Sequence, residues 1–204
     1  MSFPRRWVVA TGNAGKLAEI RALLAGTGLE LVAQGELGIE AAEEPGATFV
    51  ENALIKARHA AGRSGLPAMA DDSGLAVDAL HGAPGIRSAR YGGPGADDRR
   101  NLETLLAALE GKPPHERGAS FHCVAVALLE PEDPIPMLAH GCWRGRIAAA
   151  RAGANGFGYD PIFVDPLLGR TGAELSPAAK NEISHRAMAF RTLAALLRSR
   201  EAQA

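Results

Sequence analysis

Short apolar runs alternate with segments whose apolar residues recur at helical spacing. Residues 7–10 form an apolar run, a loop of small residues follows, and leucine and isoleucine then recur three and four positions apart over residues 17–24. This order predicts a strand, a loop and a helix. A second strand is expected over residues 29–33. Residues 119–129 predict the clearest strand of the chain, and a proline-containing turn leads from it to a further apolar run.

That run, residues 137–143, is expected to form a hairpin with the strand before it, and a third strand near residues 146–149 would extend the hairpin. Residues 81–95 are so rich in glycine and proline that they predict a long irregular connection. No repeat or linker divides the sequence. We therefore expect one domain over residues 1–204, of the α/β class, in which helices flank a sheet.

Several helix starts are marked by capping residues. Thr48 and Glu51 have the spacing of a capping box and predict a helix that ends near residue 61. A second helix is expected over residues 97–109, and Ser176 followed by proline predicts a short third one. The terminal helix is expected to begin at Ser184-His185-Arg186 and to turn its apolar side chains inward. These side chains are Met188, Leu193, Leu196 and Leu197.

Composition excludes some classes of partner. The chain has 22 Lys and Arg against 23 Asp and Glu, so its net charge of -1 provides no field for nucleic acid or an anionic membrane. Cys123 and Cys142 have no metal-binding spacing, which favours reduced thiols. The longest apolar run is far shorter than the roughly 20 residues of a membrane span, and residues 1–6 do not look like a signal peptide. We expect a cytoplasmic protein.

The segment Ala70-Asp71-Asp72-Ser73-Gly74-Leu75 is the first candidate for chemistry. It follows a short apolar run, so we expect the two carboxylates where a buried strand ends in a loop, the usual place for a site in α/β proteins. Adjacent side chains of an extended chain point in opposite directions, which leaves one working carboxylate. Asp72 is then a Mg²⁺ ligand or a base that activates water. The alternative is an ordinary turn.

The loop Thr11-Gly12-Asn13-Ala14-Gly15-Lys16 is the second candidate. Its backbone N–H groups and the following helix start are suited to phosphate, and Lys16 adds a positive charge. A cation is unfavourable at this end of a helix dipole, so a bound anion would explain Lys16. The loop is not a P-loop, because Ala10 and Leu17 replace its first glycine and its hydroxyl residue. The alternative is an ordinary turn between strand and helix.

Further candidate residues have both a functional and a structural interpretation. Lys56 lies beside the apolar stripe of its helix and, by itself, is most simply a surface lysine. Glu40, Glu43 and Glu44 are in themselves a solvated acidic loop. Phe157, in the glycine-rich segment 153–164, is either a stacking face for a nucleobase or a core residue. His185 is either a hydrogen-bond donor to a ligand or an ordinary surface histidine.

Together these signals fit one ligand, a nucleoside triphosphate. Such a ligand needs cations for its phosphates, carboxylates for Mg²⁺, an aromatic ring against its base and donors that read the base. The candidates for the phosphates are Lys16, Lys56 and Lys180, and those for Mg²⁺ are Asp72 with Glu43 or Glu44. Phe157 is the candidate ring, and His185 and Arg186 are the candidate donors to the base.

The sequence resembles the inosine triphosphate pyrophosphatases, which act on non-standard purine nucleotides. Six ordered blocks carry the resemblance. They are Thr11 to Lys16, Thr48-Phe49-Val50-Glu51-Asn52-Ala53, Ala70 to Leu75, Gly85-Ile86-Arg87-Ser88-Ala89-Arg90-Tyr91, Phe157-Gly158-Tyr159-Asp160-Pro161-Ile162-Phe163, and Ser184-His185-Arg186.

The resemblance implies a fold and an activity. The fold would be a two-lobed α/β subunit with a long mixed sheet and an active-site cleft between the lobes, assembled as a homodimer. The activity would be the Mg²⁺-dependent hydrolysis of ITP, dITP and XTP to the monophosphate and pyrophosphate, a house-cleaning reaction. Rival interpretations are a related pyrophosphatase for modified pyrimidine or methylated nucleotides, and a nucleotide-binding sensor without turnover.

The resemblance also implies roles for individual residues. Thr11, Gly12, Asn13, Ala14, Gly15 and Lys16 would hold phosphates, and Ser73 would contact substrate. Asp72 would be the proton acceptor and a metal ligand, with Glu44 as the favoured second carboxylate, although the match does not separate it from Glu43. Phe157, Gly158, Tyr159, Asp160, Lys180, His185 and Arg186 would complete the nucleotide site. Donors such as Arg186 would favour a purine with a 6-carbonyl over adenine.

Overall fold

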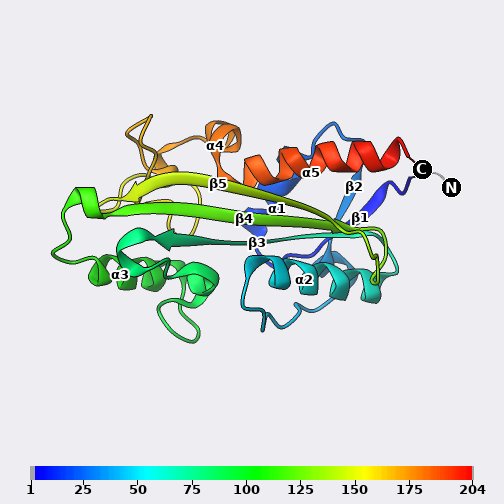
Figure 1. Cartoon of the computed structure of the whole chain (residues 1–204), viewed down its shortest axis with the longest axis horizontal. Helices are drawn as coiled ribbons and strands as arrows, with labels where there is room; N and C mark the ends of the chain where they lie inside the picture. The colour runs from blue at the N-terminus through cyan, green and yellow to red at the C-terminus, as the bar shows by residue number, and fades with distance from the viewer. Residues whose placement is uncertain (1–2, 204) are drawn as a thin grey trace. The chain divides into compact units, whose positions relative to one another are not determined.

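The computed structural model describes residues 3–203 and contains a mixed six-stranded sheet flanked by helices (Figure 1). The strand order is β2-β1-β3-β4-β5-β6. β1 pairs in parallel with β2 and β3, whereas β5 and β6 pair antiparallel. The strands are β1 (Arg6–Val9), β2 (Glu30–Ala33), β3 (Ala68–Val77), β4 (Gly118–Leu128), β5 (Met137–Ile147) and β6 (Phe163–Val164). The helices are α1 (Ala14–Leu23), α2 (Phe49–Ser64), α3 (Asp98–Ala108), α4 (Pro177–Ile183) and α5 (His185–Glu201).

The chain divides into two compact units, and each is described here by itself. Unit 1 consists of Met1–Asp72, Cys123–Gly141 and Arg186–Ala204. Unit 2 consists of Ser73–His122 and Cys142–His185. The expectations of a single domain and of a cleft between lobes stay predictions. The α/β class is confirmed by the sheet and its helices.

In unit 1 the side chains of each strand alternate between two apolar layers. Val8, Ala68 and Ala70 belong to the layer that packs against α2, whereas Trp7 and Met69 belong to the layer that packs against α1 and α5. Figure 1 shows α2 and α5 on opposite sides of the strands. Because side chains of a strand alternate with period two, the same alternation carries the next residues of β3 to opposite faces.

Unit 2 has its own core beneath α3. This helix contributes Leu102 and Leu105, which are almost completely buried together with Leu109 just after its end. They pack against residues from the second half of β3, from β4 and β5, and from the segment around β6. These residues are Leu75, Val77, Ala119, Phe121, Trp143, Ile147, Tyr159, Ile162, Phe163 and Leu175.

The predicted capping residues are confirmed. Thr48 accepts a hydrogen bond from the backbone N of Glu51, whose carboxylate in turn accepts one from the backbone N of Thr48, so the capping box of α2 is complete. Ser176 is the N-cap of α4 and Pro177 its first residue. These signals are local in sequence, which is why the helix starts could be predicted.

Three predictions about the elements are wrong. Asp71 and Asp72 do not lie in a loop, since β3 continues through both to Val77. The strand expected near residues 146–149 is the end of β5, because residues 137–147 form one uninterrupted strand. Met188 does not turn inward, and 38% of its surface is exposed.

Two other expectations concern segments outside the regular elements. The irregular connection over residues 81–95 contains a short 3-10 helix, Gly85–Arg90, and follows another, Asp78–Leu80. Within residues 3–203, no helix combines the length and the apolar character needed to cross a membrane. The cytoplasmic location stays a prediction.

Candidate active site

The first site lies on the α2 face of β3, around the carboxylate of Asp72. The Nζ of Lys56 lies 2.7 Å from one Asp72 oxygen and 3.3 Å from an oxygen of Glu44. Asn52 donates to the other Asp72 oxygen over 3.4 Å. The Lys56 side chain is only 12% exposed, so the interpretation of a surface lysine is wrong. The ammonium group of Lys56 therefore contacts the carboxylates of both Glu44 and Asp72, which are far apart in sequence.

Burial sets the proton affinities in this group. It raises the pKa of Asp72 above the ordinary value, although Lys56 acts in the opposite direction. Burial also disfavours the charged form of Lys56, but the carboxylates of Asp72, Asp71 and Glu44 outweigh it and raise the pKa of Lys56. Lys56 is therefore a permanent cation at neutral pH, and Asp72 is a stronger base than an aspartate in water.

On the opposite face of β3, Asp71 is the centre of a separate buried ion cluster. One oxygen of Asp71 accepts hydrogen bonds from Nε and Nη2 of Arg186 at 3.2 and 3.1 Å and lies 3.4 Å from the Nζ of Lys16. Arg186 also donates from Nη1 to Glu19 over 2.5 Å, and the thiol of Cys123 lies 3.8 Å from Asp71. Burial alone would raise the pKa of Asp71, but Lys16 and Arg186 hold it well below its usual range. The inference that the two aspartates cannot share a pocket is confirmed.

The loop before α1 is a regular helix start. Asn13 is the N-cap and accepts a hydrogen bond from the backbone N of Lys16 at 2.9 Å, while Thr11 accepts one from the N of Asn13 at 3.1 Å. Asp71 supplies a protein anion beside Lys16, and this anion offsets the unfavourable dipole. A side chain at Gly12 would meet no atom within 4 Å, so the protein itself does not require glycine there.

In unit 2 the predicted nucleotide residues gather around Asp160. One oxygen of Asp160 accepts from the backbone N of Phe157 at 2.9 Å and from the Nζ of Lys180 at 2.5 Å, and that Nζ lies 4.8 Å from the centre of the Phe157 ring. Tyr159 is 4% exposed and donates its hydroxyl to the carbonyl of Ser88. Tyr159 therefore fills the core, whereas Phe157 stays partly exposed and is not a fully buried core residue.

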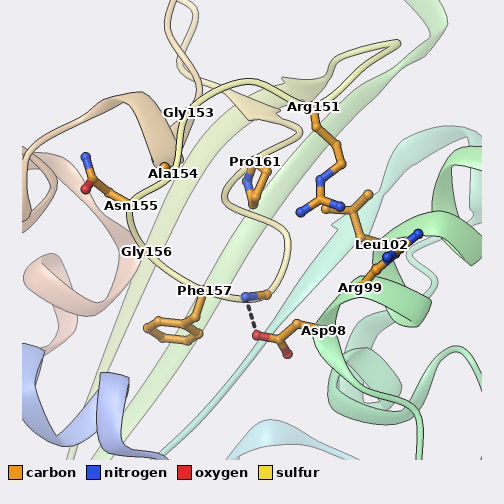
Figure 2. Close-up of a pocket in the computed structure, with 11 residues that line it drawn as sticks. Asp98, Arg99, Leu102, Arg151, Gly153, Ala154, Asn155, Gly156, Phe157 and Pro161 are labelled. Carbon is orange, nitrogen blue, oxygen red and sulfur yellow. Dashed lines mark hydrogen bonds between the residues drawn. The ribbon is translucent and has the colours of Figure 1, made fainter.

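The remaining predicted residues lie on neighbouring elements. His185 is buried and stacks on Phe121 with 4.7 Å between the ring centres, so the interpretation of a surface histidine is wrong. Ser73 follows Asp72 in β3 and is partly exposed. The backbone N of Gly158 donates to Asp98 of α3 over 2.7 Å, beside a pocket of about 220 Å³ (Figure 2).

The oxygen donors of unit 1 fit a hard divalent cation. Mg²⁺ keeps several of its waters and is commonly held by one or two carboxylates together with substrate phosphates. Asp72 and Glu44 provide two such carboxylates, both near Lys56, whereas Glu43 is exposed and makes none of these contacts. Among residues 3–203, no group of three or more His, Cys, Asp or Glu side chains is close enough to form a complete metal cage.

Three members of these groups were missed at the level of sequence. Asn52 accepts from the backbone N of Gly46 and donates to Asp72, so it links the acidic loop to β3. Glu19 holds Arg186, and Asp98 holds the loop at Gly158. Two of the three gave a signal in the sequence: Asn52 lies four residues before Lys56, and Glu19 lies three residues after Lys16, each on the same face of a predicted helix.

The chain was compared with protein families, curated proteins and solved structures. The model described as the Ham1 family matches residues 7–196. A dITP/XTP pyrophosphatase of Yersinia pseudotuberculosis is 60% identical over 191 residues, which are 94% of this chain and 97% of that protein. One from Escherichia coli O157:H7 is 56% identical over 192 residues, 94% of this chain and 98% of that protein.

The solved structures give the same result for the fold. A HAM1 protein from Coxiella burnetii matches with a TM-score of 0.88 and 48% identity, over 96% of this chain and all of that one. The Ham1 protein of Staphylococcus aureus matches with a TM-score of 0.83 and 39% identity, over 96% and 99% of the two chains. With a family model and relatives that match nearly end to end, the chain belongs to the Ham1 family.

Proposed function

We propose that this protein hydrolyses ITP, dITP and XTP to the nucleoside monophosphate and pyrophosphate, and so removes non-standard purines from the nucleotide pool. A fold by itself does not determine an activity. The observation that carries the proposal is the 60% identity, over 94% of the chain, to a relative named dITP/XTP pyrophosphatase.

The cluster around Asp72 supports attack by water at the α-phosphorus. Asp72 would orient the water and accept its proton, for which a buried carboxylate of raised pKa is suited. Asp72 and Glu44 would hold Mg²⁺, which would withdraw charge from the phosphates. Lys56 and Lys16 would offset the negative charge of the leaving pyrophosphate. The open space at Gly12 lets a phosphate approach the backbone N–H groups of the loop from Thr11 to Lys16.

The residues around Asp160 support binding of the base. The partly exposed ring of Phe157 would stack on the purine, and Lys180 would hold the ring from one side while Asp160 fixes the backbone. Gly158 and Tyr159 complete this loop. His185 and Arg186 would donate to the base, in particular to a 6-carbonyl, and Ser73 would contact the substrate.

The proposal also covers the protein's location, oligomeric state and partners. We expect a cytoplasmic homodimer, as the family resemblance implies. The balanced charge of -1 favours neither nucleic acid nor an anionic membrane as a partner. Light scattering at a range of protein concentrations measures the oligomeric state.

A substrate panel tests the activity. Purified protein with Mg²⁺ is given ITP, XTP, dITP, ATP, GTP and TTP in separate reactions, and pyrophosphate and orthophosphate are both quantified. We expect pyrophosphate from ITP, XTP and dITP and little from ATP or GTP. Chelation of the metal should abolish this turnover. A site built around a 6-carbonyl leaves a donor facing the amino group of adenine, and this mismatch gives strong discrimination.

Other outcomes of the panel would overturn the proposal in distinct ways. Orthophosphate as the only product would move the attack to the terminal phosphate. Turnover of methylated or modified pyrimidine nucleotides alone would favour the related pyrophosphatases. Tight binding of ITP without any product would leave a nucleotide sensor.

Removal of the Phe157 ring should weaken substrate binding. Base stacking on an aromatic side chain contributes about 1–3 kcal/mol, so Phe157→Ala should raise the KM for ITP by roughly five- to a hundredfold. Phe157→Tyr keeps the ring and is the matched control. Equal KM values for the alanine variant and the unchanged protein would exclude Phe157 from the base site.

A further inference from the structure

The loop that presents Phe157 is held by carboxylates at two successive backbone N–H groups. The N of Phe157 donates to Asp160 over 2.9 Å, and the N of Gly158 donates to Asp98 over 2.7 Å. Asp160 belongs to the loop's own chain segment, whereas Asp98 is the first residue of α3, about 60 residues earlier. Figure 2 shows the hydrogen bond that Asp98 accepts as a dashed line beside the Phe157 ring.

Asp98 is not needed to start its own helix. The N-cap of α3 is Asp97, whose carboxylate accepts a hydrogen bond from the backbone N of Arg100 at 2.8 Å. The side chain of Asp98 is directed instead toward the loop. Two adjacent aspartates therefore have different partners, one within the helix and one outside it, and substitutions can separate these contacts.

A pocket lies between part of the loop and α3. It has a volume of about 220 Å³ and is lined by the loop backbone over residues 153–158 and by Asp98, Arg99 and Leu102 of the helix. Figure 2 shows the loop curving around this space. At the edge of this pocket, the hydrogen bond from Gly158 to Asp98 joins the loop directly to the helix. A carboxylate acceptor makes this bond stronger than one between neutral groups.

A second carboxylate restraint acts within the loop itself. A Cβ at Gly156 would lie 2.1 Å from the Asp160 carboxylate, so glycine is what allows Asp160 to approach the backbone and bind the N of Phe157. This contact fixes the loop locally but does not tie it to α3. With Asp98 removed, the turn at Phe157 and Gly158 loses its hydrogen bond to α3. Asn155 and Tyr159 on either side stay held by the carbonyls of Leu175 and Ser88, so the change is confined to the part of the loop that presents the ring.

We propose that Asp98 is a positioning residue for substrate binding: by accepting the hydrogen bond from Gly158, it holds the Phe157 ring in the orientation that stacks on the purine base. This inference rests on the proposed function, in which Phe157 contacts the base. Asp98 itself touches no reacting atom, so its loss changes binding rather than the chemical step.

Three variants test this role. Asp98→Ala removes the acceptor and should raise the KM for ITP about three- to tenfold, with kcat within about twofold of the unchanged protein, since one hydrogen bond is lost. Asp98→Asn keeps a carbonyl oxygen that can accept the same bond, so it should restore most of the KM. Asp97→Ala is the matched control: it removes the helix cap, and should lower thermal stability without changing KM.

Hydrogen exchange reports on the loop without any turnover. In the ligand-free protein, Asp98→Ala should speed exchange of the amides around Gly158, and Asp97→Ala should not. Unchanged exchange in Asp98→Ala would overturn the restraint, and faster exchange with an unchanged KM would overturn the positioning role.

If the unchanged protein releases no pyrophosphate, the proposed function fails. The Kd for ITP measured by calorimetry then replaces KM, and an equal Kd for all three variants overturns the role of Asp98.

Discussion

Asp72→Asn should lower the kcat for ITP hydrolysis by about 10²–10⁴-fold, the usual contribution of a positioned general base. The amide keeps the size of the carboxylate and can still accept the hydrogen bond from Lys56, which is 2.7 Å away. What it loses is the ability to take a proton from water and a full negative charge toward Mg²⁺. The fold should survive, because the shape and the contact with Lys56 remain.

Steady-state kinetics with ITP measure this effect, and thermal unfolding checks the fold. Glu43→Gln is the matched control, since Glu43 lies next to Glu44 but is exposed and lacks its contact with Lys56. Glu44→Gln should impair turnover and Glu43→Gln should not. Near-normal turnover in Asp72→Asn would remove Asp72 from the mechanism.

Asp71→Ala should destabilise the fold instead. Removal of one partner of a buried ion pair leaves an uncompensated charge and costs about 3–5 kcal/mol of the free energy of unfolding. Here the remaining charge is Arg186, only 1% exposed, beside Lys16, with Glu19 as its other carboxylate partner. For a chain of this size the melting temperature should fall by roughly 6–20 °C.

Glu36→Ala is the control for the loss of an ion pair in general. Glu36 lies 2.7 Å from Arg21, but both side chains are about half exposed, so the melting temperature should hardly change. Equal melting temperatures for Asp71→Ala and the unchanged protein would show that the buried cluster does not stabilise the fold.

The pH dependence of unfolding gives the same variant a second readout. The folded-state pKa of Asp71 is lowered, so its stabilising effect is complete above the unfolded pKa of about 3.9 and is lost as the pH falls below that value. The difference in stability between Asp71→Ala and the unchanged protein should therefore be constant near neutral pH and shrink in acid.

Features that depend on neighbouring residues could be predicted from the sequence. The capping box of Thr48 and Glu51 and the Ser176-Pro177 helix start are complete within four residues, and both are present. The alternation that separates Asp71 from Asp72 is also local, since it follows from strand geometry alone.

Features that depend on distant partners could not. Two adjacent aspartates followed by Ser73 and a glycine are typical of a turn, yet they continue a strand because buried cations offset their charge. Lys56 looks like a surface lysine until the chain brings Asp72 and Glu44 to it, and those residues are 16 and 12 positions away. The stacking of His185 on Phe121 likewise joins residues with no sequence signal in common.

The alternation of side chains along β3 also limits which insertions and deletions the gene can tolerate. Loss or gain of a single residue within Ala68–Ala70, with the strand's pairing kept, would move each aspartate to the other face of the sheet. A deletion would put Asp72 in the place of Asp71 beside Arg186 and leave Ser73 beside Lys56, whereas an insertion would put Asp71 beside Lys56 and leave Arg186 without its aspartate. Either change therefore removes the carboxylate from one of the two clusters, so the gene should tolerate length changes in the loops of this chain but not in this part of β3.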